Sequence, residues 1–247
     1  MTGRIDWLTA RPITHRGLHD VSRGIVENTL GALAAAIGQN YAIECDLQVT
    51  ADGEAVLFHD DTLDRVAEAI GPLKSLTVAQ LKHVKLKHTK ETIPTLAEVL
   101  TLVDSRVPVV IELKPQWDGD TTLAERTVEI LQHYTGHHAL MSFDPDVIEA
   151  VRRLSPDTVR GMICDDALHT SYDALPADAR AELRTLSYLG RTAPDFMSAD
   201  FHFLPWAPLA ALRARGMPVI TWTIRSPDEA RQALRDCDQI TFEGFAA

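Results

Sequence analysis

Residues 41–60, YAIECDLQVTADGEAVLFHD, contain the pattern that decides the fold. An apolar segment carries Glu44 and Asp46, a turn sequence follows at Asp52-Gly53, and a second apolar segment ends at His59. The connection is too short for a parallel crossover, which needs about a dozen residues. An Asp-Gly pair between apolar segments is typical of a two-residue type I′ turn. We therefore predict an antiparallel β-hairpin at this point of the chain.

The register of this hairpin would set a histidine beside two acids. With Asp52 and Gly53 at the tip, counting back along both strands sets His59 opposite Asp46. Side chains alternate between the faces of a strand, so Glu44 and Asp46 point the same way. Two neighbouring carboxylates repel each other, and a hard divalent cation between them is the simplest compensation. A one-residue slip would turn His59 to the other face, and an edge hairpin with surface acids is the alternative.

Composition and charge limit the classes of partner. The chain has 247 residues, 45% of them hydrophobic, and a formal net charge of -11, which argues against general attraction to nucleic acid or to anionic membranes. No stretch approaches the ~18 apolar residues of a membrane span, and the N-terminal residues have no apolar signal core. Cys45, Cys164 and Cys237 are far apart in sequence. This spacing predicts reduced, buried thiols in a cytoplasmic protein.

Strands and helices alternate along the rest of the chain. Eight strands are predicted, at residues 12–14, 41–47, 107–113, 139–143, 159–164, 196–199, 218–223 and 239–242. Eight parallel strands with intervening helices predict an α/β fold, a TIM-type (β/α)8 barrel. A doubly wound open sheet is the alternative, but no glycine-rich phosphate loop joins a strand to a helix. We expect a single domain over residues 1–247, with a small insertion at about 60–106, after the second strand and its hairpin.

Polar residues gather where the predicted strands end, which is where barrels of this type carry their chemistry. These residues are His15, Arg16, Glu44, Asp46, Glu112, Lys114 and Trp222, joined by His59 from the hairpin. Three acids without cysteine favour Mg²⁺ or Ca²⁺ over zinc. Arginine and lysine beside such an ion favour a phosphate ligand. Two histidines suggest an acid and a base near neutral pH, because the unperturbed imidazole pKa is about 6.5.

The order of the motifs resembles the glycerophosphodiester phosphodiesterase family over nearly the whole chain. The matching motifs are HRG at 15–17, ENT at 27–29, ECD at 44–46, TADG at 50–53, HDDTLDR at 59–65, IPTLAEVL at 93–100, IELK at 111–114, SFD at 142–144 and WTI at 222–224. The resemblance implies a TIM-like barrel enzyme. Such an enzyme hydrolyses glycerophosphodiesters to an alcohol and sn-glycerol 3-phosphate, with a divalent cation and histidine acid/base catalysis.

The resemblance also implies a role for each residue at the strand ends. Metal binding falls to Glu44, Asp46 and Glu112, acid/base catalysis to His15 and His59, phosphodiester binding to Arg16 and Lys114, and the alcohol side of the pocket to Trp222. We favour His15 as the base and His59 as the acid. The sequence leaves open whether water attacks directly or the glycerol 2-hydroxyl attacks first through a cyclic phosphate.

Several positions depart from the pattern of the family. Val26 stands where a proline is usual, Arg65 is not followed by the usual threonines, Arg225 replaces an asparagine, and residues 241–243, Thr-Phe-Glu, replace a Thr-Asp pair. We hypothesise that Arg225 recognises a second anionic group. Two alternative functions remain at this point: a related phosphodiesterase acting on lysophospholipids or sugar phosphodiesters, and a barrel that binds phosphodiesters without catalysis.

Overall fold

A closed barrel forms the centre of the computed structural model, which describes residues 5–169 and 172–247. Within these residues the sheet has nine strands in the order β1-β9-β8-β7-β6-β5-β4-β2-β3, and pairing of β1 with β2 closes it. The strands are β1 (Ile13–Thr14), β2 (Ala42–Val49), β3 (Ala55–Leu57), β4 (Val109–Leu113), β5 (His138–Ser142), β6 (Val159–Cys164), β7 (Phe196–Asp200), β8 (Val219–Ile224) and β9 (Gln239–Phe242). All except the antiparallel β3 run parallel, which confirms the predicted TIM-type barrel.

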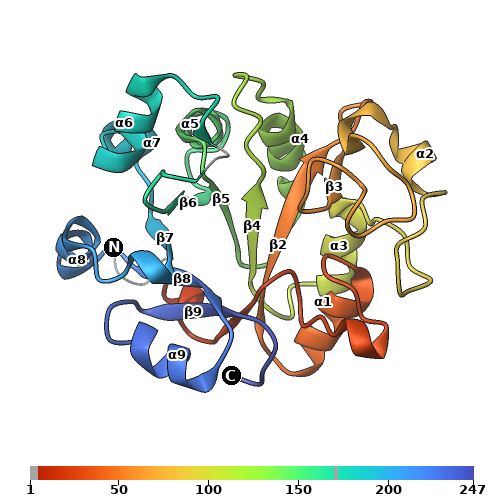
Figure 1. Cartoon of the computed structure of the whole chain (residues 1–247), viewed down its shortest axis with the longest axis horizontal. Coiled ribbons are helices and arrows are strands. Elements are labelled where there is room, and N and C mark those ends of the chain that lie inside the picture. Colours follow the sequence, from red (N-terminus) through yellow and green to blue (C-terminus); the bar gives the residue numbers. More distant parts are fainter. Residues whose placement is uncertain (1–4, 170–171) are drawn as a thin grey trace.

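Helices surround the barrel, as Figure 1 shows. They are α1 (Leu30–Gly38), α2 (Val78–Leu81), α3 (Leu96–Val103), α4 (Thr122–Leu131), α5 (Pro145–Leu154), α6 (Ala177–Thr185), α7 (Leu189–Thr192), α8 (Ala207–Ala214) and α9 (Pro227–Ala233). Shorter 3₁₀ turns lie at Asp6–Leu8, Val21–Arg23, Leu73–Ser75 and Phe201–Phe203. Thr95 and Glu98 form a capping box at the start of α3. In the part of the chain that is described, no helix has the length and apolar character needed to cross a membrane.

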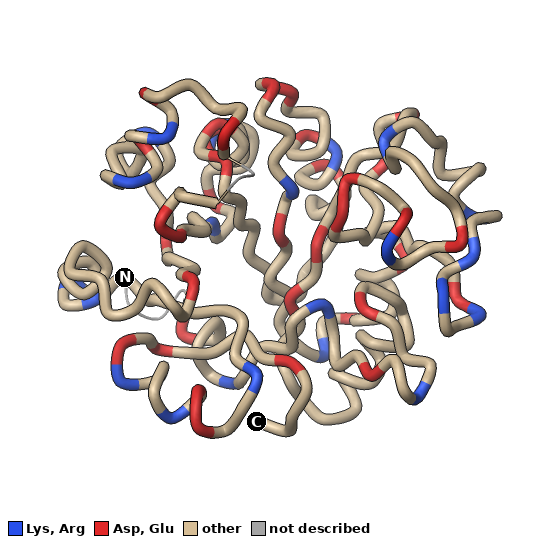
Figure 2. The backbone as a smooth tube through the Cα atoms, in the orientation of Figure 1, with Lys and Arg blue, Asp and Glu red and all other residues tan. Residues whose placement is uncertain are grey.

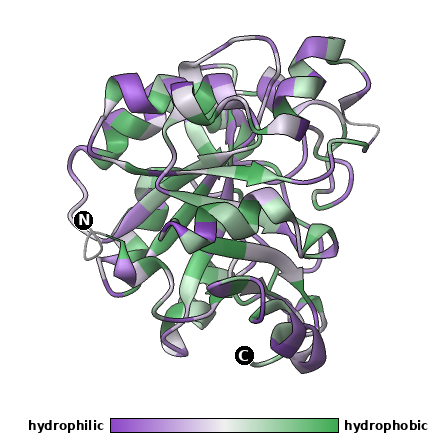
Figure 3. Cartoon of the chain, turned by 90° about the vertical axis from the view of Figure 1, so that its left-hand side faces the viewer, coloured by the Kyte–Doolittle hydropathy of each residue, from purple (hydrophilic) through white to green (hydrophobic). Residues whose placement is uncertain are grey.

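Alternation along β2 separates the hydrophobic core from the polar interior. Ile43, Cys45 and Leu47 pack outward with the helices, because they share one core cluster with residues of α1, α3 and α4. The intervening Glu44 and Asp46 face the inside of the barrel. Figure 3 shows the same division on the whole molecule, with hydrophobic residues concentrated on the central strands and beneath the helices. Cys45 is therefore a packing residue, and all three cysteines are free and buried, as predicted.

The segment between β3 and β4 has a small core of its own. Phe58, Leu63, Leu73 and Leu81 belong to a separate cluster of buried apolar residues. Helix α3, at the end of the same segment, packs instead into the core that β2 and β4 share. Figure 1 shows the segment beside β3, at the edge of the barrel. The boundaries of the insertion, about 60–106, stay a prediction.

The β2–β3 hairpin forms, but its predicted register is wrong by one residue. Val49 pairs with Ala55, and Thr50 and Glu54 close a loop of three residues, not two. Only Gly53 in this loop has a positive φ, of 79°, whereas a type I′ turn needs two such residues. The Thr50 hydroxyl also accepts a hydrogen bond from the Glu54 amide at 2.9 Å, which stabilises the longer loop.

This register changes how His59 reaches the site. Phe58, and not His59, lies across from Asp46, and its amide donates to the Asp46 carbonyl at 3.1 Å. His59 lies two positions beyond the last residue of β3, so the alternation of side chains between the two faces of the strand does not determine its direction. It still reaches the pocket at the end of the barrel, because it lies in the segment that turns away from the sheet there.

Candidate active site

A pocket of about 860 Å³ lies at the carboxyl ends of the barrel strands. Four of the predicted residues line it: His59, Glu112, Lys114 and Trp222. The other four, His15, Arg16, Glu44 and Asp46, lie outside this lining. Figure 2 shows acidic positions in the middle of the molecule, along the central strands. The structure thus brings the strand ends together, while the chemical roles of these residues stay predictions.

Three buried carboxylates form one cluster at this end of the barrel. Oxygens of Glu44, Asp46 and Glu112 all lie within 4.8 Å of one another. Asp46 and Glu112 are partners in the parallel pairing of β2 with β4, so the fold sets them side by side. Burial, and then the neighbouring negative charges, raise the pKa of Glu44 well above its usual value. Burial also raises the pKa of Glu112, although Lys114 opposes it.

Asp46 is the carboxylate of the cluster that is held ionised. The Lys114 Nζ lies 3.1 Å from its Oδ1 and 2.8 Å from Glu112 Oε1. Burial would raise the pKa of Asp46, but Lys114 and the other nearby cations outweigh burial and lower it. The Asn28 side chain donates to Asp46 Oδ2 at 2.8 Å and accepts from the Asp46 amide at 3.2 Å. These bonds fix the orientation of the carboxylate.

The HRG loop turns back over the carboxylate cluster. Arg16 has a positive φ of 56°, and its amide donates to Glu44 Oε2 at 2.9 Å. Its guanidinium donates to Glu27 at 2.8 Å and lies 3.4 Å from Asp46 Oδ2. The next residue must be glycine, because a Cβ at Gly17 would lie 2.8 Å from the backbone carbon of Ala32. This tight turn presents the side chain of the preceding histidine at the end of β1.

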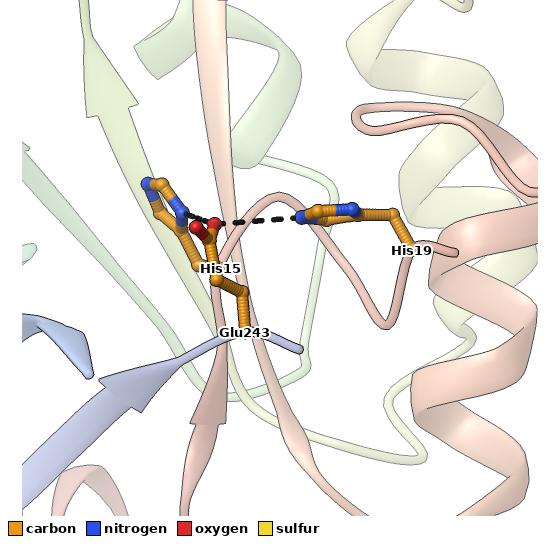
Figure 4. Close-up of side chains that lie close together, drawn as sticks. All are labelled: His15, His19 and Glu243. Carbon is orange, nitrogen blue, oxygen red and sulfur yellow. Dashed lines mark hydrogen bonds and ion pairs between the residues drawn. The ribbon is translucent and has the colours of Figure 1, made fainter. Parts of the chain in front are cut away.

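His15 is paired with a carboxylate from the far end of the chain. Its Nδ1 lies 2.6 Å from Glu243 Oε2, one residue beyond the end of β9. The same oxygen lies 3.5 Å from Nε2 of His19, so Glu243 stands between two imidazoles (Figure 4). Burial lowers the pKa of His15, although the hydrogen bond with Glu243 acts in the opposite direction. His15 is therefore neutral near pH 7.

His59 has its carboxylate next to it in the sequence. Its Nδ1 lies 2.6 Å from Asp60 Oδ1, and Asp60 in turn accepts from Arg65 Nε at 2.6 Å. Arg65 also donates two hydrogen bonds to Glu27, at 2.8 and 2.7 Å, and Glu27 accepts from Arg16. Burial would raise the pKa of Asp60, but the bonds from His59 and Arg65 lower it below its usual value. A continuous network of ion pairs thus joins the hairpin to the HRG loop.

The opposite wall of the pocket has a different character. It includes aromatic rings and carboxylates, namely Trp117, Phe143, Tyr172, Phe203, Trp222, Asp165, Asp166 and Asp200, together with Leu168, His169 and His202. The rings of Phe143 and Trp222 meet edge to face at 5.7 Å. Among the described residues that line the pocket, Lys114 is the only lysine or arginine, and it lies at the carboxylate cluster. The pocket therefore has a polar end with His59 and Lys114 on one side and a largely aromatic and acidic wall on the other.

Sequence reasoning missed several residues that hold this arrangement. Asn28, Asp60 and Arg65 lie inside the ENT and HDDTLDR motifs, so their position in the motifs was a usable signal. Glu243 and Arg225 stand at two of the positions that depart from the family pattern. They contact each other, since Arg225 Nε donates to Glu243 Oε1 at 2.8 Å. The change from the usual family residues at both positions was the available signal in the sequence. Only the closed barrel shows that the two positions lie together.

Comparison with known proteins gives one consistent result. The family model described as "Glycerophosphoryl diester phosphodiesterase family" matches residues 15–241. A glycerophosphodiester phosphodiesterase of Caldanaerobacter subterraneus is 30% identical over 162 residues, which cover 61% of this chain and 65% of that protein. Human glycerophosphodiester phosphodiesterase 1 is 29% identical over 246 residues, covering 88% of this chain and 72% of that protein. The chain thus covers less than two thirds of the bacterial relative.

Solved structures share the fold. A phosphodiesterase of Oleispira antarctica, solved in complex with the product sn-glycerol 3-phosphate, aligns with a TM-score of 0.78 and 25% sequence identity. The alignment covers 94% of this chain and 91% of that one. The similarity therefore extends over the whole barrel.

Proposed function

The chain belongs to the glycerophosphoryl diester phosphodiesterase family, and from this premise we propose that it hydrolyses glycerophosphodiesters to sn-glycerol 3-phosphate and an alcohol. One observation carries the proposal. Two histidines, each paired through Nδ1 with a carboxylate, lie at the same barrel end as three buried acids and a lysine. The product held by the Oleispira antarctica relative supports the same reaction class.

We propose that Glu44, Asp46 and Glu112 hold a divalent cation, Mg²⁺ or Ca²⁺. The donor set fits such an ion, because it offers only carboxylate oxygens and is buried. Burial, and then the negative charge of the neighbouring Asp46 carboxylate, raise the pKa values of Glu44 and Glu112. When bound, such a cation polarises a phosphoryl oxygen and offsets developing charge.

The two histidines divide the proton transfers. His15 and His59 each engage Nδ1 with a carboxylate, so Nε2 is the nitrogen left for the substrate. His15 is neutral and buried, which suits a base that takes the proton of the attacking oxygen, from water or from the glycerol 2-hydroxyl. His59 lines the pocket and would protonate the leaving alkoxide. Each transfer is typically worth about 10²–10⁴-fold in rate.

Lys114, Arg16 and Trp222 serve binding in this proposal. The Lys114 ammonium is at the pocket wall beside the carboxylate cluster, where it would meet the phosphate of a bound diester. Arg16 adds positive charge behind Asp46. Trp222 contributes an aromatic surface for the alcohol part of the substrate. The aromatic and acidic wall suits a cationic alcohol, because rings and carboxylates together attract such groups. Glycerophosphocholine and glycerophosphoethanolamine are therefore the first substrates to test.

The decisive experiment is hydrolysis of these two diesters after treatment with EDTA, followed by addition of Mg²⁺ or Ca²⁺. Release of glycerol 3-phosphate is measured for the native protein, for His59→Ala and for His83→Ala. The last variant is a matched control, because His83 is an exposed histidine outside the pocket lining. We expect turnover that requires the metal, is lost in His59→Ala and is retained in His83→Ala.

Other outcomes would redirect the assignment. A folded, metal-loaded protein that cleaves neither diester but cleaves lysophospholipids or sugar phosphodiesters would belong to a related activity. A protein that binds glycerophosphodiesters and cleaves none of these compounds would be a binding barrel. Turnover that survives EDTA, with no metal detected by elemental analysis, would contradict the role given to the three carboxylates.

A further inference from the structure

Glu243 has more polar contacts than its position near the end of the chain requires. Its Oε2 lies 2.6 Å from His15 Nδ1 and 3.5 Å from His19 Nε2, and its Oε1 accepts from Arg225 Nε at 2.8 Å. The three partners come from the loop after β1 and from the end of β8. In Figure 4 the carboxylate lies between the two imidazoles. The carboxylate is therefore fixed from three directions, although its own segment has no further strand or helix after β9.

The two departures from the family pattern compensate each other. Arg225 and Glu243 carry opposite charges and form an ion pair, so introducing one beside His15 without the other would leave an unpaired charge there. Arg225 is itself held, because its amide donates to Glu229 at 2.6 Å. Its guanidinium donates to Oε1 of Glu243, whereas His15 contacts Oε2. This contact gives Arg225 a place in the site that does not need a second anionic group on the substrate.

The hydrogen bond between His15 and Glu243 determines which nitrogen of His15 carries the proton. An ionised carboxylate can only accept hydrogen bonds, so the imidazoles that face Glu243 must donate to it. The hydrogen bond from His15, together with the nearby His19 and Arg225, holds the pKa of Glu243 well below its usual value, so it is ionised. His15 then carries its proton on Nδ1 and has a lone pair on Nε2. A neutral ring of the other tautomer would point a lone pair at the carboxylate and would have no free acceptor for the substrate.

We propose that Glu243 is the positioning residue of His15, holding the ring in the Nδ1–H tautomer so that Nε2 accepts the proton. Arg225 and His19 keep the carboxylate in place. The proposal rests on the proposed function for its kinetic consequence, but the tautomer of His15 is a property of the protein without substrate. The donor set of two imidazoles and a carboxylate also suits Zn²⁺, and the experiment separates that possibility from positioning.

The test compares native protein with Glu243→Gln, Glu243→Asp and the control Glu129→Gln. Gln keeps the shape but its amide can donate to Nδ1, which favours the wrong tautomer. Asp keeps the charge on a shorter side chain. Glu129 is a matched control, because it is also paired with an arginine, Arg126, at 2.7 Å, but on α4 and outside the pocket lining. The tautomer of His15 is read from ¹⁵N chemical shifts of the imidazole.

For Glu243→Gln we expect kcat to fall by about 10²-fold with KM changed by less than about threefold, and the ¹⁵N shifts to move from Nδ1–H towards Nε2–H. Glu243→Asp should recover part of kcat and keep the native tautomer, and Glu129→Gln should match the native protein. An Nδ1–H tautomer that persists in Glu243→Gln would overturn the proposal. So would a tightly bound transition-metal ion in native protein that is lost in Glu243→Gln. If the native protein hydrolyses no diester, the ¹⁵N shifts alone still decide the role of Glu243, and only the proposed function fails.

Discussion

The two histidines proposed for acid/base catalysis, His15 and His59, have the same kind of partner but obtain it from different parts of the molecule. His59 pairs with the next residue, Asp60, on the loop after the hairpin. His15 pairs with Glu243, which is 228 residues away and arrives only when β9 lies beside β1. His59 is 33% exposed and His15 is 13% exposed. On the hairpin side the histidine and its carboxylate are neighbours in sequence and more exposed. At the junction of β1 and β9 the two partners are far apart in sequence and more buried. We expect the more buried histidine, His15, to be the base.

Removing either imidazole should have the largest effect on activity. We expect His15→Ala and His59→Ala each to lower kcat on glycerophosphocholine by about 10²–10⁴-fold. On a diester with a p-nitrophenol leaving group the two variants should separate, because a weakly basic leaving oxygen needs little protonation. His59→Ala should then regain most of the loss and His15→Ala should regain none. Steady-state kinetics on both substrates checks this, and recovery by His15→Ala instead would reverse the assignment of acid and base.

Removing the local carboxylate should have a smaller effect than removing the ring. For Asp60→Asn we expect kcat to fall by about 10-fold to 10²-fold, since the imidazole stays but loses the partner that orients it. KM should change little, because Asp60 bonds to His59 and Arg65 rather than to the phosphate end of the pocket. The measurement is kcat and KM beside Asp64→Asn, an exposed acid of the same loop. Equal losses in both variants would point to a general disturbance of the loop.

The ion network on the hairpin side should make stability depend on pH. Hydrogen bonds and charges from Arg65 and Arg16 outweigh burial and lower the pKa of Glu27 to about 2, from an ordinary value of 4.5. A depressed carboxyl pKa stabilises the fold above the ordinary value, and the contribution is lost as the pH falls from about 5 towards 2. We expect Glu27→Gln to lower the free energy of unfolding by roughly 2 kcal/mol at neutral pH. Urea titrations from about pH 7 to about pH 3 should show this gap shrink, and a constant gap would contradict the linkage.

The arginines behind the two carboxylates should show the smallest difference. Arg225 is 57% exposed and makes one hydrogen bond to Glu243, so Arg225→Ala should lower kcat by only about two- to fivefold, in line with about 0.5–1 kcal/mol for an exposed ion pair. Arg65 makes four hydrogen bonds, two to Glu27 and two to Asp60. Arg65→Ala should therefore cost more than Arg225→Ala in both kcat and melting temperature. The reverse order would show that the His15–Glu243 pair depends on Arg225 more than the single hydrogen bond between Arg225 and Glu243 suggests.

The same contrast explains what could be predicted from the sequence. The eight barrel strands could be predicted because each is a short apolar run followed by polar residues, as in the segment that became β4. Asp60 was missed as the partner of His59, although both residues stand in one motif and are neighbours in the sequence. Glu44 and Asp46 could be placed on one face from alternation alone. These features depend on neighbours in sequence, where the geometry of strands and turns is nearly fixed.

Features that depend on the exact loop of the hairpin, or on how the last strand of the barrel meets the first, could not be predicted from the sequence. The hairpin register was missed by one residue because an Asp-Gly pair fits both a two-residue loop and the three-residue loop that forms. Asn28 and Thr29 are both residue types that cap helices, but Thr29 caps α1, whereas Asn28, with a positive φ of 55°, turns to Asp46. Glu243 could not be joined to His15, because nothing in sequence spacing tells how the last strand of a barrel meets the first.

The pairing of β1 with β9 also has a consequence for the synthesis of the protein. A ribosome adds about 5–20 residues per second, so it takes roughly 10–50 s to travel the 228 residues between His15 and Glu243. Once Glu112 has been added, the nascent chain contains His15, His59 and all three buried acids, but it still lacks the carboxylate that pairs with His15. Because β9 closes the barrel beside β1, a growing chain would complete the proposed site only after synthesis has passed the last strand.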